Sequence, residues 1–231
     1  NHDTAPSETA RVLSTHLGMK IVLYGASGHG RVVADIVSAI PGLELMGFVD
    51  DDLSRHGEQV GRFPVLGGQE ILSELRKVGV EGAIATIGEN KRRMQIAKVL
   101  KELGFQLVTV VHPSAVLAPD VFTGEGTVIM PGVVINAAVR IGPNVIVNTG
   151  VTVDHECVLE DGCHLSPGVH LAGNIWVGKE AHVGIGASVI QNIRIGEESV
   201  VGAGAVVIRD VPPQKTVVGN PAKELVGPAE R

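Results

Sequence analysis

A six-residue period dominates the second half of the chain. Every sixth residue from Val111 to Val207 is Ile, Leu or Val, with Thr123 as the one departure, and the residue four places further on is small or branched throughout, from Ala115 to Val211. A period of six fits neither an amphipathic helix nor an alternating strand. It is typical of hexapeptide repeats, in which each unit adds a short strand and a turn to a parallel β-helix. The unbroken register predicts one continuous coil.

A different pattern precedes the coil. From Met19 onward, short apolar runs typical of strands alternate with longer stretches of helical periodicity. Strands are expected at 20–24, 45–49, 83–87 and 106–111, and helices at 31–39, 68–77 and 90–103. This alternation predicts an α/β Rossmann-like domain, a small parallel sheet with helices on its faces, over residues 19–110. The all-β parallel β-helix domain then covers residues 111–231. The polar residues 1–18 are interpreted as an extension or linker outside both domains.

Composition and charge narrow the class of protein. The chain of 231 residues has one Trp, one Tyr and four Phe, so aliphatic side chains must build its cores. A net charge of −6 argues against nucleic acid as a partner, because phosphate binding needs a basic surface. No apolar run approaches the roughly 20 residues that span a bilayer, so no membrane span is expected. Both cysteines, Cys157 and Cys163, fall on inward-pointing repeat positions, which favours buried thiols and a reducing, cytoplasmic location.

A glycine-rich segment, Gly25-Ala-Ser-Gly-His-Gly30, joins the first expected strand to the first helix. Glycines let a backbone approach a ligand closely, and the helix that follows offers free N–H groups to phosphate. Because the spacing differs from the dinucleotide fingerprint, we expect a nucleotide diphosphate here rather than a redox cofactor. The candidate contacts in this segment are Gly25, Ser27, Gly28, His29 and Gly30. Asp50 and Asp51 follow the second strand, where an acidic group can reach a ribose or a base. A plain tight turn and a solvated acidic turn are the alternatives.

The repeat also predicts which polar residues of the coil lie together. Three hexads make one turn, so residues 18 apart stack on neighbouring coils about 4.8 Å apart. His182 should then stack on His164, and Gly173 should lie beside His155. The polar residues within one coil's length are Asn148, His155, Glu156 and His164. Such a group among Val and Ile is costly unless it is used or solvated, so a functional site is expected here.

His155 is the candidate general base, because histidine exchanges protons near neutral pH. Its neighbours Asp154 and Glu156 are placed to hold the imidazole tautomer. For any one histidine alone, a surface role is the alternative. Zinc at His155, His164 and His182 is a rival use of the cluster. No nearby Cys or His completes a tetrahedral set by its spacing, so no metal is expected.

Four segments together resemble the NeuD/PglD group of bacterial sugar O- or N-acyltransferases. They are the hexapeptide repeat, the Gly25–Gly30 segment, Asp154-His-Glu-Cys157 and Gly219-Asn-Pro-Ala-Lys223. The resemblance implies a left-handed β-helix, a homotrimer, acetyl-CoA bound between adjacent coils, and a nucleotide sugar held by the first domain. Left-handed crossovers break the usual chirality rule, so the handedness follows from the resemblance and not from the repeat.

The resemblance also implies roles for individual residues. His155 corresponds to the general base and Glu156 to its modulator, while His164 is similar to a second histidine near the thioester or sugar. Asn148 would be a polar contact in that pocket, and Gly173 the glycine whose N–H stabilises the oxyanion. The nucleotide sugar would contact the Gly25–Gly30 segment with Asp50 and Asp51. The acetyl-CoA site would further include His182, Gly219, Asn220 and Lys223. Three cations, Arg209, Lys215 and Lys223, would be available there for the CoA phosphates.

The expected function is direct acetyl transfer from acetyl-CoA to the amine of a nucleotide-linked amino sugar, UDP-linked and 4-amino-4,6-dideoxy, for glycan biosynthesis. No acyl-enzyme is expected, because neither Cys157 nor Cys163 points outward in the repeat. One alternative is O-acetylation of sialic acid or another sugar. Another, from a different class, is a non-catalytic scaffold that binds sugar nucleotides.

Overall fold

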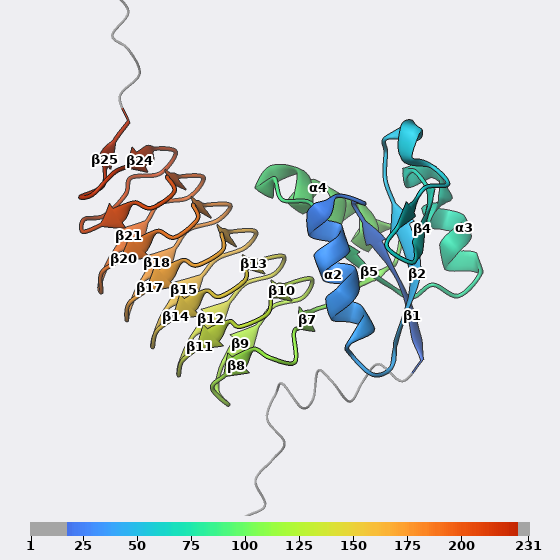
Figure 1. Ribbon diagram of the computed structural model, residues 1–231, viewed down its shortest axis with the longest axis horizontal. Helices are drawn as coiled ribbons and strands as arrows, with labels where there is room; N and C mark the ends of the chain where they lie inside the picture. Colours follow the sequence, from blue (N-terminus) through green and yellow to red (C-terminus); the bar gives the residue numbers. More distant parts are fainter. Residues whose placement is uncertain (1–17, 226–231) are drawn as a thin grey trace, which may run out of the picture.

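A computed structural model describes residues 18–225, which form an α/β domain followed by a long coil of short strands (Figure 1). The first domain contains β1 (Met19–Tyr24), α2 (Gly28–Ser38), β2 (Leu43–Val49), η1 (Leu53–Arg55), β3 (Gln59–Val60), β4 (Phe63–Gly67), η2 (Gln69–Ile71), α3 (Leu72–Lys77), β5 (Gly82–Ala85), α4 (Asn90–Glu102) and β6 (Gln106–Leu107). Its six-stranded sheet has the order β3-β4-β2-β1-β5-β6 and is parallel except for the β3–β4 hairpin. The expected extension lies outside the described residues, apart from Gly18.

Alternation along the central strand explains why helices cover both faces of this sheet. In β1, Ile21 and Leu23 pack in one apolar cluster with side chains of α2. Val22 and Tyr24 point the other way and pack in a second cluster with side chains of α3 and α4. Successive side chains of a strand point to opposite faces, so a strand buried on both sides is apolar throughout. The expected α/β domain is confirmed.

Three local expectations differ from the structure. The first helix begins at Gly28, inside the glycine-rich segment, with Ser27 as its N-cap. Residues 59–67 contribute the β3–β4 hairpin, which the hydrophobic pattern did not predict, because β3 at the sheet edge has only 2 residues and β4 beside it has 5. The strand expected at 106–111 is divided, since β6 pairs with β5 of the first sheet while β7 pairs with β10 of the coil. One apolar run therefore serves two different sheets.

Three sheets of very short strands form the faces of the coil, and they are parallel except where the last strand, Lys223–Glu224, pairs antiparallel. The first sheet contains β7 (Val110–Val111), β10 (Val128–Ile129), β13 (Ile146–Val147), β16 (His164–Leu165), β19 (His182–Val183), β22 (Val200–Val201), β24 (Thr216–Val218) and β25 (Lys223–Glu224). The second contains β8 (Val116–Leu117), β11 (Val134–Ile135), β14 (Thr152–Val153), β17 (His170–Leu171), β20 (Ser188–Val189) and β23 (Val206–Val207). The third contains β9 (Phe122–Thr123), β12 (Arg140–Ile141), β15 (Val158–Leu159), β18 (Trp176–Val177) and β21 (Arg194–Ile195).

The repeat positions of the sequence fill the interior of this coil. Strands pair with a register of 18 residues, as in Ile129 with Val147 and Val147 with Leu165. The aliphatic side chains at every sixth position and those four places further on form one continuous buried cluster, which includes Cys157 and Cys163. The expected parallel β-helix is confirmed, and its core consists of stacked aliphatic and small side chains.

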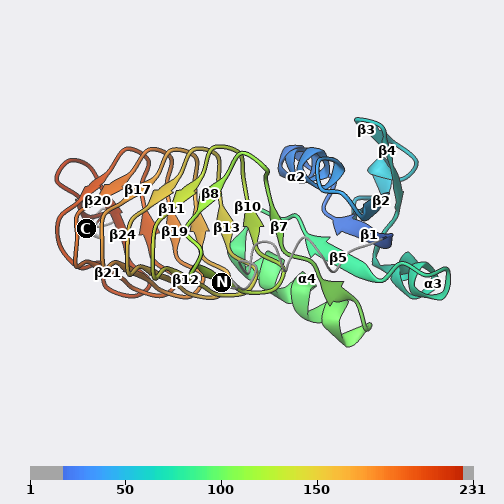
Figure 2. The ribbon, with the colours of Figure 1, turned by 90° about the horizontal axis from the view of Figure 1, so that it is seen from below.

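Helix α4 and the first coils lie side by side, as Figures 1 and 2 both show. The Asn90 side chain donates from Nδ2 to the Glu180 carbonyl at 2.7 Å. Val110, Val128 and Met130 of the coil belong to the same apolar cluster as the buried face of α2. The two domains therefore share a packed interface. Among the described helices, none is long and apolar enough to cross a membrane.

Candidate active site

His155 lies at the corner between the second and third sheets, in the turn that joins β14 to β15. The next residue, Glu156, has a φ of 61°, a left-handed conformation that turns the chain sharply. Its Oε2 lies 3.0 Å from His155 Nδ1, and both side chains are well exposed, at 58% and 66%. A carboxylate accepting from Nδ1–H leaves Nε2 free to take a proton. Glu156 thus orients the imidazole ring of His155.

Asp154 has a different task from the one expected. Its Oδ1 accepts from the His155 backbone N–H at 2.8 Å and from Asn136 Nδ2 at 2.9 Å, and these hydrogen bonds lower the pKa of its carboxyl. It therefore stabilises the turn instead of holding the imidazole. The carboxylate that contacts the ring is Glu156.

Gly173 lies directly against the imidazole of His155, as the spacing of 18 predicts. A Cβ at Gly173 would be 2.5 Å from His155 Cε1 and 2.6 Å from Nε2, so only glycine fits without moving the ring. Within the described residues, the Gly173 N–H donates to no other group of the chain. A free N–H beside a basic nitrogen can stabilise an oxyanion that forms as the base acts.

A second polar group occupies the first sheet. His164 on β16 pairs in register with His182 on β19, with ring centroids 4.8 Å apart. Asn148 Nδ2 lies 3.3 Å from His164 Nε2, and Ser166 Oγ lies 3.0 Å from His182 Nε2. His164 is only 8% exposed, and this burial lowers its pKa to about 3. Burial also lowers the pKa of His182, so both rings are neutral at physiological pH.

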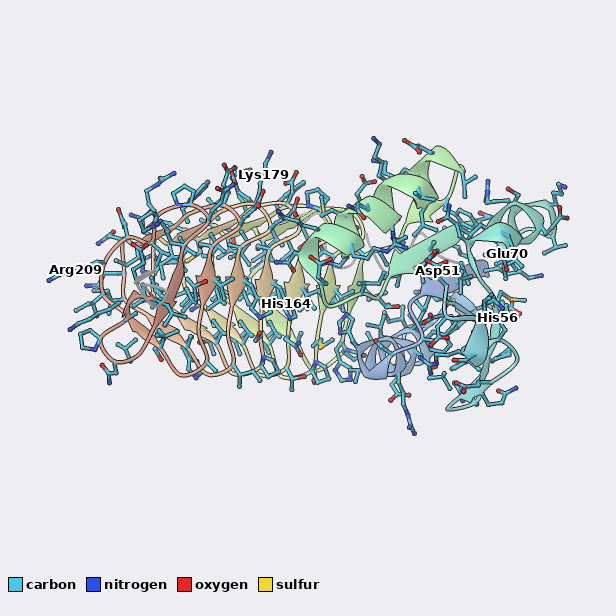
Figure 3. All side chains as sticks on the ribbon, turned by 90° about the horizontal axis from the view of Figure 1, so that it is seen from above. Asp51, His56, Glu70, His164, Lys179 and Arg209 are labelled. Atoms are coloured by element: carbon cyan, nitrogen blue, oxygen red, sulfur yellow. The ribbon has the colours of Figure 1, made fainter. Side chains whose placement is uncertain are left out.

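The residues expected as one cluster thus form two groups. His155 and Glu156 lie at one corner of the coil, whereas Asn148, His164 and His182 belong to the first sheet and the corner beside it. Of the hydrogen bonds among residues 18–225, none joins the two groups. Figure 3 shows His164 on the part of the coil that is nearer the first domain, with Arg209 at the opposite end.

A cavity of about 390 Å³ lies in the first domain, where β1, β2 and β5 end. Carboxyl ends of parallel strands are where open α/β sheets bind ligands. The lining residues are Tyr24, Gly25, Ser27, Asp50, Asp51, Thr86, Ile87, Gly88 and Arg92. Of the segment named from the sequence, Gly25 and Ser27 reach the cavity, and both acidic candidates do as well.

The glycines of the Gly25–Gly30 segment are explained by different features of the structure. Gly25 has a φ of 115°, and a Cβ there would lie 2.8 Å from the Thr86 carbonyl oxygen. A Cβ at Gly30 would lie 2.1 Å from the Gly25 carbonyl oxygen, so the segment could not close. Around Gly28, no atom lies within 4 Å of an added Cβ. Gly25 and Gly30 are required by the fold, whereas Gly28, the first residue of α2, has open space beside it.

The two aspartates are already engaged by the protein. Asp50 Oδ2 accepts from the Ala26 N–H at 2.8 Å, which ties the glycine-rich segment to β2. Asp51 accepts from Tyr24 Oη at 2.7 Å and from Arg92 Nη2 at 2.7 Å. Burial and the Asp51 carboxylate raise the pKa of the Tyr24 hydroxyl. Tyr24, Thr86 and Arg92 were not among the residues expected from the sequence, although the strand expected at 83–87 ends at this edge of the sheet.

His29 differs from its expected place. It lies on α2 and is not among the residues lining the cavity. Burial and the charge of Arg93 lower its pKa to about 4, and the charge it would carry lowers the pKa of His164. Within the described residues its buried Nε2 has no hydrogen-bond partner. His29 therefore faces the side of the domain that packs on the coil.

The remaining candidates lie at the far end of the coil (Figure 1). Gly219 has a φ of 95° and accepts from the Val206 N–H at 3.0 Å, which closes the last turn. Asn220 and Lys223 follow it and are exposed. Lys215 pairs with Glu224 at 2.7 Å, which neutralises one of the three cations expected for CoA phosphates. Across residues 18–225, no group of three or more His, Cys, Asp or Glu side chains could hold a metal ion.

Comparison with known proteins gives several matches. Residues 20–100 match the family model described as the PglD N-terminal domain. A curated relative, UDP-N-acetylbacillosamine N-acetyltransferase of Bacillus subtilis (strain 168), is 37% identical over 111 residues, and the match spans 48% of this chain and only half (50%) of the relative.

Two solved structures match over nearly their whole length. PerB from Caulobacter crescentus, in complex with CoA and GDP-perosamine, is 40% identical, with a TM-score of 0.85 over 90% of this chain and 97% of that chain. The acetyltransferase domain of PglB from Neisseria gonorrhoeae, in complex with acetyl coenzyme A, is 38% identical, with a TM-score of 0.84 over 90% and 100%. The likeness supports the expected left-handed β-helix.

Proposed function

Because this chain belongs to the family of PglD-type sugar N-acetyltransferases, we propose that it transfers an acetyl group from acetyl-CoA to the amine of a nucleotide-linked amino sugar. The observation that carries the proposal is His155, with its Nδ1 on Glu156 and its Nε2 against the Gly173 backbone. The acceptor that we propose first is a UDP-linked 4-amino-4,6-dideoxy sugar, by analogy with the curated relative, and GDP-perosamine is the second. Acetyl-CoA and sugar nucleotides are cytoplasmic metabolites, so we propose that this step of glycan biosynthesis takes place in the cytoplasm.

The reaction requires one base and one oxyanion donor. The neutral sugar amine attacks the thioester carbon, and His155 Nε2 takes the proton that the nitrogen loses. The carbonyl oxygen becomes an oxyanion, to which the Gly173 N–H donates. Collapse breaks the C–S bond, and the CoA thiolate takes the proton back from the imidazolium. The products are the N-acetyl sugar nucleotide and CoA, with no enzyme-bound acyl group.

We propose that the active enzyme is a homotrimer, in which the His155 corner of one subunit faces the His164 sheet of its neighbour. The separation of the two polar groups on one coil supports this arrangement, because a single subunit supplies only one wall of a site. Exposed apolar side chains on the coil, among them Val116, Phe122 and Ile185, offer contact surface for such a neighbour. Arg209 and Lys223 remain candidates for the CoA phosphates at the far end.

Mixed trimers test whether the site is shared. His155→Ala and His164→Ala subunits should each be nearly inactive alone, and their co-expression should restore activity, because some interfaces then carry both histidines. Sedimentation establishes the assembly in each sample. An active monomer, or stable mixed trimers without activity, would contradict the shared site.

The function itself is tested by acceptor profiling with acetyl-CoA and detection of released CoA. Turnover of UDP- or GDP-linked 4-amino sugars is expected, and His155→Ala should lower kcat by about 10²–10⁴ while the affinity for CoA changes little. Turnover of sialic acid instead would mean O-acetylation. Absence of CoA release with every acceptor would indicate a binding scaffold.

A further inference from the structure

Arg93 on α4 is a buried cation without a buried anion beside it. Its side chain is 1% exposed, and burial lowers its pKa to about 10. Within the described residues every acceptor of its guanidinium is a carbonyl or amide oxygen. Burying a charge is expensive unless it is paired and hydrogen-bonded, and here hydrogen bonds to neutral oxygens are the compensation.

The hydrogen bonds of Arg93 join two parts of the molecule. Nη1 donates to the Ile87 carbonyl at 3.0 Å and to the Gly88 carbonyl at 3.2 Å, and both residues line the nucleotide cavity. On the coil side, Nε donates to the Asn144 carbonyl at 2.9 Å and Nη2 donates to the Gly162 carbonyl at 2.6 Å. One planar group thus connects the wall of the cavity to two successive coils.

The same contacts reach the strand that carries His164. Gly162 and Cys163 immediately precede β16, and Arg93 Nη2 also lies 3.4 Å from the Cys163 carbonyl. Asn90 extends the series, since it accepts from Arg93 at 2.9 Å and donates to Glu180 on the next coil. The hydrogen bonds of Arg93 and Asn90 thus reach carbonyls on three successive turns, all at the same corner of the coil. A rigid fork with donors in fixed directions can set this register, which a flexible lysine cannot.

We propose that Arg93 is a positioning residue that holds the nucleotide cavity in register with the His164 strand, so that the sugar amine and the thioester meet. The inference rests on the proposed function. Simple docking of the domains does not require it, because Val110, Val128 and Met130 already join the coil to the α2 face through apolar contacts. Arg93 acts through the carbonyls that it binds and is not a catalytic residue.

The test compares Arg93→Lys and Arg93→Met with Arg76→Met. Arg76 is the matched control, because it also donates to a carbonyl (Val80, 2.8 Å) and stacks on Phe105, but stays within the first domain. The affinities for UDP, GDP and CoA are measured separately by calorimetry, and kcat and KM with the best acceptor by CoA release. For both Arg93 variants we expect affinities within about threefold of the wild type and a kcat at least about tenfold lower. Misalignment of bound groups acts on the chemical step. The control should keep its kcat.

Several outcomes would overturn this role. A folded Arg93→Met with normal kcat and only a lower melting temperature would make Arg93 a structural tie. A rise in KM for the acceptor with unchanged kcat would show that Arg93 affects only the cavity. If Arg93→Met does not fold, Arg93→Lys and the milder Asn90→Ala carry the same comparison. Failure of the wild type to turn over any amino sugar would reject the proposed function instead, and that result is read before any variant.

Discussion

Replacing Gly173 by alanine tests whether the position of His155, the proposed general base, matters separately from its chemistry. The added Cβ would lie 2.5–2.6 Å from two ring atoms of His155, closer than van der Waals contact allows. The ring is the end of an exposed side chain, so it can swing away. The backbone at Gly173 does not have a left-handed φ, and alanine adds no strain there. The fold should therefore survive while the imidazole loses its place.

The size of the effect follows from what the ring does. If His155 is displaced, the loss should approach that of removing a positioned general base, about 10²–10⁴ in kcat. This corresponds to about 3–5.5 kcal/mol in activation free energy, since each factor of ten is about 1.4 kcal/mol. Stability should change far less, because no apolar surface is lost and only an exposed ring moves.

A double-mutant cycle provides the assay. Steady-state kinetics of Gly173→Ala, His155→Ala and the double variant are measured by CoA release, with thermal melting as the check on folding. If alanine acts by displacing the ring, the double variant should be no slower than His155→Ala alone, because the effects are coupled. Losses that multiply would show that Gly173 acts independently of His155. A normal kcat in Gly173→Ala would refute the proposed geometry of the base.

Three further predictions follow from burial and packing. Gly28→Val should fold, because the space beside Gly28 is open, but it should raise KM for the nucleotide sugar at least about tenfold. Gly30→Val should not fold, because its side chain would collide with the Gly25 carbonyl. A normal KM in Gly28→Val would mean that the acceptor binds elsewhere. Since burial lowers the pKa of His164 to about 3 from 6.5, the unfolded chain binds that proton first as the pH falls. The free energy of unfolding should thus drop by about 1.4 kcal/mol per pH unit between those values. His164→Asn should make this dependence on pH, measured by denaturant titrations, less steep. An equal pH dependence in both proteins would argue against a buried neutral ring. Burial also raises the pKa of Cys163 to about 12 and that of Cys157. The native enzyme should therefore keep full activity after iodoacetamide, and alkylation that abolishes turnover would contradict direct transfer.

The coil could be predicted almost completely from the chain. Each hexad repeats the same local arrangement, and its strands pair only with the coils directly above and below it. The spacing of 18 therefore translated directly into contacts, as His164 on His182 and Gly173 against His155 illustrate. In the first domain, element types were predicted better than their ends. The β3–β4 hairpin and the division at residues 107–110 depend on pairings with other strands.

The site required the tertiary structure. Sequence proximity grouped Asn148, His155 and His164, but a coil turns a corner every few residues, so neighbours along the chain point to different faces. His29 belongs to the glycine-rich segment in the sequence, yet the helix that begins at Gly28 turns it away from the cavity. Arg92 lines the cavity only because α4 begins just after β5, at the same edge of the sheet.

Local periodicity by itself determined that the chain winds into a β-helix behind an α/β domain, because each repeat pairs with the coils above and below it and extends one common core in the same way. The tertiary structure alone decided how the two domains meet. Arg93 looks like any helix cation in the sequence, and its buried contacts to Gly88 and Gly162 exist only after distant segments pack together. A hydrogen bond between segments far apart in the chain leaves no periodic trace, whereas a repeated core does.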